Sequence, residues 1–254
     1  MKYSLVALAL AGLGAVRALR AGMHRELALL GGVLAIAGVV YLAVHRAVWG
    51  GWTAYASGDH FAQTGEFAVV GVDPDYTERA LRIVGLLLDR EFGLVPWQPA
   101  WLLLVPAVAA VVALRVPGRA ALLWPLAAGW FVATFVALTM HGYWFPGRQV
   151  VVVLPLAVLV VLVWLDRAGP VARRIALGMG LAGVAGYGVF LVEGYLRRTT
   201  WVVHFVDSHV PVYRLLGPVL TTWRLDYRWP HLAGLAVVAI LAWWGIRTAR
   251  TVRT

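Results

Sequence analysis

Residues Leu27 to Val44 read LALLGGVLAIAGVVYLAV, a run without a charged side chain. A helix needs about 17–25 predominantly apolar residues to cross a hydrocarbon core that is about 30 Å thick. Runs of similar length and character recur at 97–114, 120–140, 150–165, 175–192 and 230–246. We therefore expect an all-α, polytopic integral membrane protein, folded as a helical bundle.

The composition of the 254-residue chain agrees with this expectation. Hydrophobic residues make up 61% of the chain and charged residues 13%, against roughly 45–50% and 25% in an ordinary soluble domain. This balance excludes a soluble globular enzyme, and it is the reverse of the composition that keeps a chain disordered. The absence of cysteine excludes disulfides, thiolate metal sites and cysteine nucleophiles. The net charge of +10 does not indicate nucleic-acid binding, because the cations interrupt apolar runs instead of forming a basic face.

The first apolar stretch, Tyr3 to Val16, is shorter than the others. Its length suits the central region of a signal peptide as well as a short membrane span. Lys2 in front of it and the small residues near Ala15 favour a signal peptide, whereas Arg17 stands where the cleavage site would be. Both interpretations stay open, so the sequence predicts six or seven membrane helices.

Arginine is distributed unequally over the connecting segments. Eleven arginines and only two acidic residues lie in four of them: 17–26, 115–119, 166–174 and 247–254. Short cationic loops stay in the cytoplasm. We therefore expect these segments and the C-terminus on the cytoplasmic side of the inner membrane. The remaining connections would then lie outside: 45–96, 141–149 and 193–229.

The expected spans contain no Asp, Glu, Lys or Arg. Such residues inside a membrane usually mark ion pathways, proton relays and voltage sensors. An ion pump or ion-coupled transporter is therefore not favoured. Chemistry is expected on the outer face, where 10 of the 12 acidic residues fall.

The first outer segment offers a carboxylate beside an imidazole. Asp59 and His60 follow Gly58 in a segment that begins with tryptophans, among them Trp52. Such a pair can act as general acid and base at an interface. A loop aspartate also hydrogen-bonds its own backbone in turns, so turn chemistry is the alternative interpretation.

An amphipathic helix is expected later in the same segment. Asp75 suits the N-cap position and Glu78, three residues on, completes a capping box. Leu81, Val84 and Leu88 then recur on one face. Such a helix would lie on the outer leaflet or over the mouth of the bundle, with its arginines on the polar side.

Two outer arginines are candidates for binding phosphate. Arg90 follows the amphipathic helix, and Arg148 lies near the end of the second outer segment, His141 to Gln149 (HGYWFPGRQ). A guanidinium presents a rigid fork of donors that matches phosphate oxygens. The alternative for Arg90 is local pairing with Asp89 or Glu91, and the alternative for Arg148 is snorkelling at the helix end. The alternative for the aromatic residues of the second outer segment is an interfacial belt.

The third outer segment contains His204, Asp207 and His209, a minimal set of metal ligands. Phe205 and Val206 stand between them and are typical of ordinary packing. A divalent metal ion is not indicated, and the cofactor is unknown. The segment also holds five arginines, which suit contact with the phosphate of a membrane lipid.

Three stretches carry a resemblance to a known group. They are Gly58 to Phe61, Gly85 to Leu104 (GLLLDREFGLVPWQPAWLLL) and Thr139 to Val158 (TMHGYWFPGRQVVVVLPLAV). They resemble polytopic bacterial membrane proteins related to the GT-C glycosyltransferases. That superfamily includes the protein O-mannosyltransferases and other enzymes that use polyprenyl-phosphate-linked sugars.

The resemblance implies transfer of a sugar on the outer face of the cytoplasmic membrane. A carboxylate would take a proton from the acceptor hydroxyl, and arginines would stabilise the departing lipid phosphate. On this chain the resemblance implies Asp59 as the base with His60 beside it, and Arg90 and Arg148 as phosphate ligands. The other substrate-binding candidates are His141 and the tryptophans Trp52, Trp97 and Trp144, whose rings can stack on a sugar or on the lipid stem.

The chain departs from the family in one respect. GT-C enzymes carry an acidic signature on the first outer loop, whereas here the only acidic residue before Leu27 is Glu26, on the expected cytoplasmic side. The chain would then correspond to the later part of such an enzyme. The alternatives are a truncated fragment, a noncatalytic subunit that works with a membrane protein partner, and a lipid-binding scaffold.

The predicted sidedness can be tested by labelling. Because the chain has no cysteine, a single cysteine introduced by Thr254→Cys is the only reactive thiol. We expect a membrane-impermeant maleimide to label it only after the cells are permeabilised, and to label Ser57→Cys in intact cells. Labelling of Thr254→Cys in intact cells would show that the predicted topology is inverted.

Overall fold

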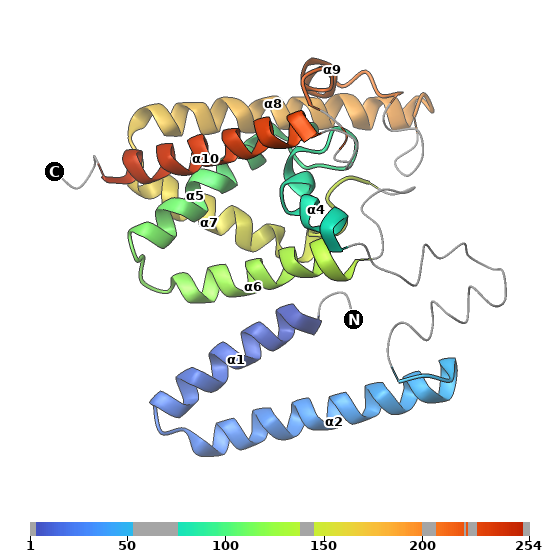
Figure 1. Ribbon diagram of the computed structural model, residues 1–254, viewed down its shortest axis with the longest axis vertical. Coiled ribbons are helices and arrows are strands. Elements are labelled where there is room, and N and C mark those ends of the chain that lie inside the picture. The colour runs from blue at the N-terminus through green and yellow to red at the C-terminus, as the bar shows by residue number, and fades with distance from the viewer. Residues whose placement is uncertain are drawn as a thin grey trace. The chain divides into compact units, whose positions relative to one another are not determined.

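The computed structural model describes residues 4–52, 76–137, 145–199, 207–220, 222 and 228–250. These residues form helices and turns, with no strand among them. The chain divides into two compact units, one over Tyr3–Pro74 and one over Asp75–Thr254 (Figure 1). Of the predicted site residues, Asp59, His60, His141 and Trp144 lie outside the described part of the chain.

The first unit is a helical hairpin. The helix α1 (Ser4–Arg20) is followed by a turn at Gly22, which has a φ of 69°, and then by α2 (His24–Trp49). Gly50 ends α2 in the left-handed conformation that glycine adopts without strain, and its N–H bonds the carbonyl of Arg46. No residue of α2 is buried, although α2 packs against α1 within the hairpin.

The second unit holds the remaining elements in chain order: α4 (Tyr76–Leu88), η1 (Pro99–Leu103), α5 (Leu104–Ala113), α6 (Arg119–Phe131), η2 (Val132–Val136), η3 (Val151–Val153), α7 (Leu154–Arg167), α8 (Pro170–Tyr195), α9 (Pro211–Leu216) and α10 (Arg228–Arg250). The helix α5 packs against α10 on one side and α7 on the other. Around this centre, α6 packs on α7, α8 on η1, and α4 on η2.

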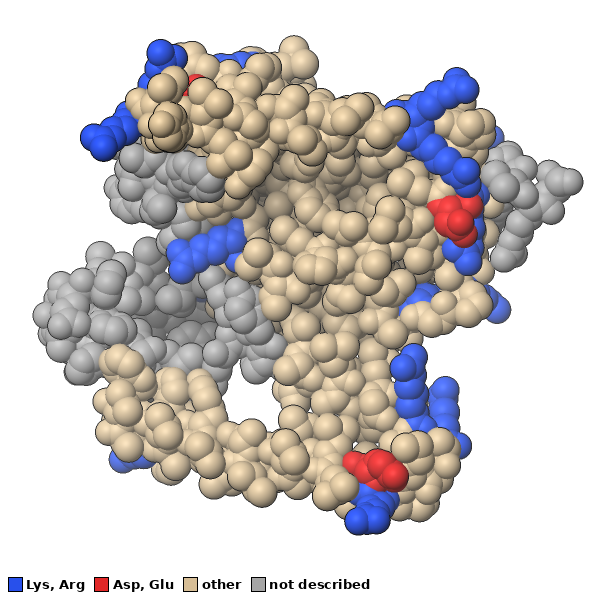
Figure 2. All heavy atoms as spheres, turned by 180° about the vertical axis from the view of Figure 1, so that it is seen from behind, with Lys and Arg blue, Asp and Glu red and all other residues tan. Residues whose placement is uncertain are grey.

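In the described part of the chain, four helices are long and apolar enough to cross a membrane: α2, α6 together with η2, α8 and α10. The other expected spans also fold as helices, but they are shorter, as in Pro99–Ala113 and in α1 with its 17 residues. In the second unit the charged side chains gather near the ends of the helices and leave a broad uncharged flank between them (Figure 2). This distribution is typical of a membrane protein.

Prolines fix where several helices begin. A proline stands in the first turn of each of four helices: Pro99 in η1, Pro155 in α7, Pro170 in α8 and Pro211 in α9. There the missing N–H costs no hydrogen bond, and the restricted φ is already helical. Pro125 is the exception, because it lies inside α6.

The amphipathic helix α4 lies where the sequence predicts it, but the expectation for its arginines is wrong. Arg79 is buried, at 7% exposed, and its guanidinium donates to the carbonyl of Phe135 at 2.6 Å. Arg82 donates to the carbonyl of Ala137 at 2.9 Å. Carbonyls at the end of a helix have no partner within that helix, so the two arginines turn toward the end of η2 instead of toward the solvent.

The contact between α5 and α10 is a close approach of main chains. Ala107, Ala110 and Val111 of α5 are almost completely buried, and their small size brings α10 near. A Cβ atom at Gly245 of α10 would overlap the main chain of Pro106. Glycine and other small residues permit such approaches between helices in lipid.

We therefore expect Gly245→Ala to lower the free energy of unfolding by about 1–3 kcal/mol, because the added methyl group overpacks a main-chain contact. The measurement is unfolding of the purified protein in mixed micelles by titration with a denaturing detergent. Gly178→Ala is the matched control, since a Cβ at that position of α8 meets nothing within 4 Å. Equal stability of the two variants would contradict the close approach.

Candidate functional site

A buried carboxylate lies near the C-terminal end of α8. Glu193 is 6% exposed, and it shares the inward face of the helix with Gly183, Gly186 and Phe190. The uncharged run of the sequence ends at Val192, but the helix continues beyond it to its last residue at 195. The inward face therefore includes an acidic residue, which the sequence analysis placed in a loop.

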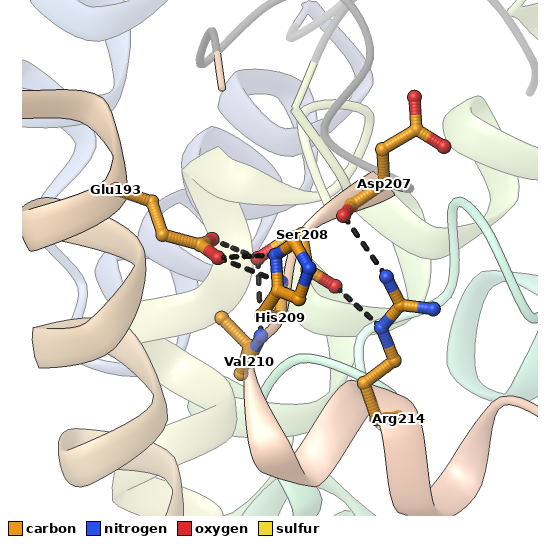
Figure 3. A network of polar contacts seen from close by, with 6 residues as sticks. All are labelled: Glu193, Asp207, Ser208, His209, Val210 and Arg214. Carbon is orange, nitrogen blue, oxygen red and sulfur yellow. Dashed lines mark hydrogen bonds and ion pairs between the residues drawn. The ribbon is translucent and has the colours of Figure 1, made fainter. Parts of the chain in front are cut away.

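Three donors surround the Glu193 carboxylate (Figure 3). The Ser208 hydroxyl donates to Oε2 at 2.5 Å. The main-chain N–H of His209 donates to Oε1 at 2.8 Å, and its ring Nδ1 lies 3.0 Å from the same atom. An ionised carboxylate only accepts hydrogen bonds, so Nδ1 carries a proton in this contact. In the neutral imidazole that leaves Nε2 as the proton acceptor, on a side chain that is 78% exposed.

The loop that supplies these donors is held from its other side by α9. Arg214 donates through Nε to the carbonyl of Ser208 at 2.9 Å and through Nη2 to the carbonyl of Asp207 at 3.1 Å. The Ser208 hydroxyl also accepts the N–H of Val210 at 3.2 Å. The hydroxyl is thus committed to the loop and to Glu193, so Ser208 is not placed as a nucleophile activated by the histidine.

The metal interpretation gains no support from this loop. Figure 3 shows the Asp207 carboxylate directed away from the His209 ring, with only its main-chain carbonyl turned toward Arg214. In the described residues no group of three His, Cys, Asp or Glu side chains is placed to hold a metal ion. His204 lies outside the described part of the chain.

A hollow of about 440 Å³ opens beside the Glu193–His209 pair. Its polar lining consists of Glu193, His209 and Arg198. The rest of its wall is apolar and follows the C-terminal end of α8 and the residue after it: Gly188, Val189, Val192 and Leu196. An acid–base pair and a guanidinium therefore border an apolar trough, which suits a ligand with a phosphate and a hydrocarbon chain.

Trp97 lies at the centre of an aromatic cluster. Its ring stacks on Tyr213 with centroids 4.3 Å apart and meets Phe190 edge-on at 5.9 Å. Phe145 is 6.1 Å away, and the indole N–H donates to the carbonyl of Glu91 at 3.2 Å. Because Trp97 is only 9% exposed and Tyr213 covers one face of its ring, most of Trp97 serves in packing, and the remainder lines a neighbouring hollow.

Arg90 belongs to the same cluster. Burial raises the pKa of the Tyr213 hydroxyl, while a hydrogen bond from Arg90 and its positive charge oppose that rise. The neighbouring Asp89 is fully buried and accepts the N–H groups of Glu91 at 2.9 Å and Phe92 at 2.8 Å. Arg90 is thus directed toward Tyr213 of α9, and as a residue it is exposed.

The other predicted residues are more dispersed. Arg148 is exposed on a turn in which Gly147 has a φ of 79° and leaves no room for a Cβ beside Leu94. This turn begins three residues earlier at Phe145, which contacts Trp97, so the turns of Arg90 and Arg148 meet at one aromatic cluster. Trp52 belongs to the first unit, where the Arg46 guanidinium lies 5.7 Å from its ring.

Comparisons of the chain with protein-family models, with curated proteins and with solved structures give no match. The candidate site therefore depends on its own geometry. The sequence pattern indicated His209 only as a metal ligand and did not indicate Glu193. Helical spacing is a usable signal for Glu193. It follows Gly183, Gly186 and Phe190 at intervals of three or four residues, so it lies on the same face of α8 as the two glycines.

We expect Glu193→Gln to lower the free energy of unfolding by about 1–3 kcal/mol, because the amide cannot accept from all three donors and leaves a buried polar group unpaired. Thermal unfolding of the purified protein in nanodiscs measures the change. The matched control is Asp166→Asn, whose side chain is 79% exposed. Equal losses for both variants would show that the network around Glu193 does not stabilise the fold.

Proposed function

We propose that the protein is an integral membrane transferase, related to the GT-C glycosyltransferases, that acts on a polyprenyl-phosphate-linked sugar at the outer face of the cytoplasmic membrane. The proposal includes six or seven spans, with the shorter helices crossing beside the four long ones. It also includes the sidedness inferred from arginine, which would place the loop at residues 207–210 outside.

The observation that carries the proposal is the carboxylate–imidazole pair beside the apolar hollow. Glu193 holds the His209 ring through Nδ1 at 3.0 Å, and Arg198 lines the same hollow. General base, cation and apolar trough are the three features that a lipid phosphate substrate needs. They supply a proton acceptor, a counter-charge and a place for the chain.

The reaction would proceed by proton abstraction and displacement. Nε2 of His209 takes the proton of the acceptor hydroxyl as its oxygen attacks the anomeric carbon of the sugar. The bond between that carbon and the phosphate oxygen breaks, and polyprenyl phosphate leaves with the electron pair. Glu193 stabilises the imidazolium that forms, and Arg198 stabilises the charge on the departing phosphate.

The residues selected from the sequence have supporting roles in this proposal. Arg90 and Arg148 would bind the phosphate of the lipid from the side of the aromatic cluster. Trp97 would position that cluster. Five candidates stay as further acid–base or substrate contacts: Asp59, His60, His141, Trp52 and Trp144. Asp59 and His60 would then form a second pair, whose contribution is separable from that of His209 by mutation.

A lipid-binding scaffold is the second candidate. It is favoured by the predominantly apolar wall of the hollow, which would bind polyprenyl phosphate whether or not a sugar is transferred. The partner in both cases is a membrane lipid, and a scaffold would present it to another membrane protein.

The test is release of radiolabelled sugar from a polyprenyl-phosphate hexose by the full chain in proteoliposomes. We expect His209→Ala to reduce turnover by about 10²–10⁴-fold, the usual contribution of a general base, while the protein still binds the lipid. His24→Ala is the matched control, because His24 is an exposed histidine at the start of α2.

Equal turnover by His209→Ala and the unaltered protein would remove His209 as the base. Binding of the lipid without any turnover by the unaltered protein would favour the scaffold. Loss of turnover in Asp59→Asn alone would transfer the role of base to the first outer segment.

A further inference from the structure

A second hollow lies along α8, next to the first. It has a volume of about 250 Å³, somewhat less than the roughly 300–1,000 Å³ of pockets that enclose whole drug-sized ligands. Four of its lining residues are aromatic, and one is an amide: Trp97, Phe145, Tyr187, Phe190 and Gln98. Its size therefore suits a single ring and its substituents.

Gln98 supplies an acceptor that the described residues do not satisfy. Its Oε1 atom is buried and has no hydrogen-bond partner among them. The following Pro99 favours an extended backbone at the preceding residue, and Gln98 has φ −141° and ψ 94°. The side chain thereby reaches α8 at Gly183, where the absence of a Cβ makes room for the amide.

A buried acceptor without a partner is costly, so the ligand of this hollow should carry a donor. A hydrocarbon chain has none and would leave Oε1 unpaired. A sugar ring has hydroxyl groups that donate to such an oxygen, and C–H faces that pack against aromatic rings. The lining therefore favours a hydroxyl-bearing ring over the chain of a lipid.

The two hollows adjoin at consecutive residues. His209 lines the hollow that holds the acid–base pair, and Val210 lines the hollow that contains Gln98. In a lipid-linked sugar the ring and the phosphate are joined through a single oxygen atom, so their binding sites must lie side by side. Two hollows lined by consecutive residues are consistent with this requirement.

We propose that the hollow around Gln98 binds the sugar ring of the lipid-linked donor, with a ring hydroxyl donating to Gln98 Oε1. This inference rests on the proposed function, whose phosphate and base would lie in the adjoining hollow. It deepens that function by separating recognition of the sugar from recognition of the phosphate and the chain.

The test compares two probes of equal chain length, polyprenyl-phosphate mannose and bare polyprenyl phosphate. Their binding to the full chain in nanodiscs is measured by native mass spectrometry. We expect the unaltered protein to bind the mannose-linked lipid more tightly. Gln98→Leu should weaken binding of that lipid about three- to tenfold, the range of one net hydrogen bond, and leave binding of the bare lipid phosphate unchanged.

A pair of glycine substitutions on one helix provides the second measurement. Gly183→Ala places a Cβ where the Gln98 amide lies, so it should also weaken binding of the mannose-linked lipid selectively. Gly180→Ala is the matched control, because a Cβ there meets nothing within 4 Å. Thermal unfolding of each variant verifies that it is folded.

Equal affinity of the unaltered protein for both probes would overturn the inference, as would an equal loss for both probes in Gln98→Leu. Binding of neither probe would overturn the inference and the proposed function together. If the unaltered protein binds the mannose-linked lipid in a way that depends on Gln98 and on the sugar, but shows no turnover, the result would support the inference and contradict the proposed transferase activity.

Discussion

A carboxylate within an apolar bundle is stable only when donors replace the water that it loses. Glu193 meets this requirement with donors that all come from two consecutive residues, Ser208 and His209. The loop must therefore lie against the end of α8, although more than a dozen residues separate them in the chain. This one set of hydrogen bonds determines where the imidazole stands, and with it the wall of the neighbouring hollow.

The fixed loop also connects three segments that are distant in the sequence. Arg214 of α9 bonds the loop from the side opposite to Glu193, and the preceding Tyr213 stacks on Trp97. Trp97 in turn bonds the carbonyl of Glu91 and lies near Phe145. The turns that carry the two candidate phosphate-binding arginines are thus ordered by packing, and both arginines are exposed residues.

The positions of the helices could be predicted from the sequence because the length of an apolar run is set by the surrounding solvent. The ends of the helices could not be predicted, because a helix does not stop where the apolar run stops. Glu193 is an example, since it lies beyond the apolar run but within α8. The arginines of α4 show a second limit. Periodicity places Arg79 on a polar face, but it cannot reveal that the end of η2 offers carbonyl acceptors there. The roles of Trp97 and Gln98 likewise depend on neighbours from other helices.

Helix electrostatics also act on the charged groups at the end of α8. The C-terminal end of a helix carries partial negative charge, which favours cations and disfavours anions. At the end of α8 this favours Arg198, whereas it opposes the charge of Glu193. The three donors around Glu193 offset that opposition. His209 provides two of these donors, and 78% of its side chain is still exposed.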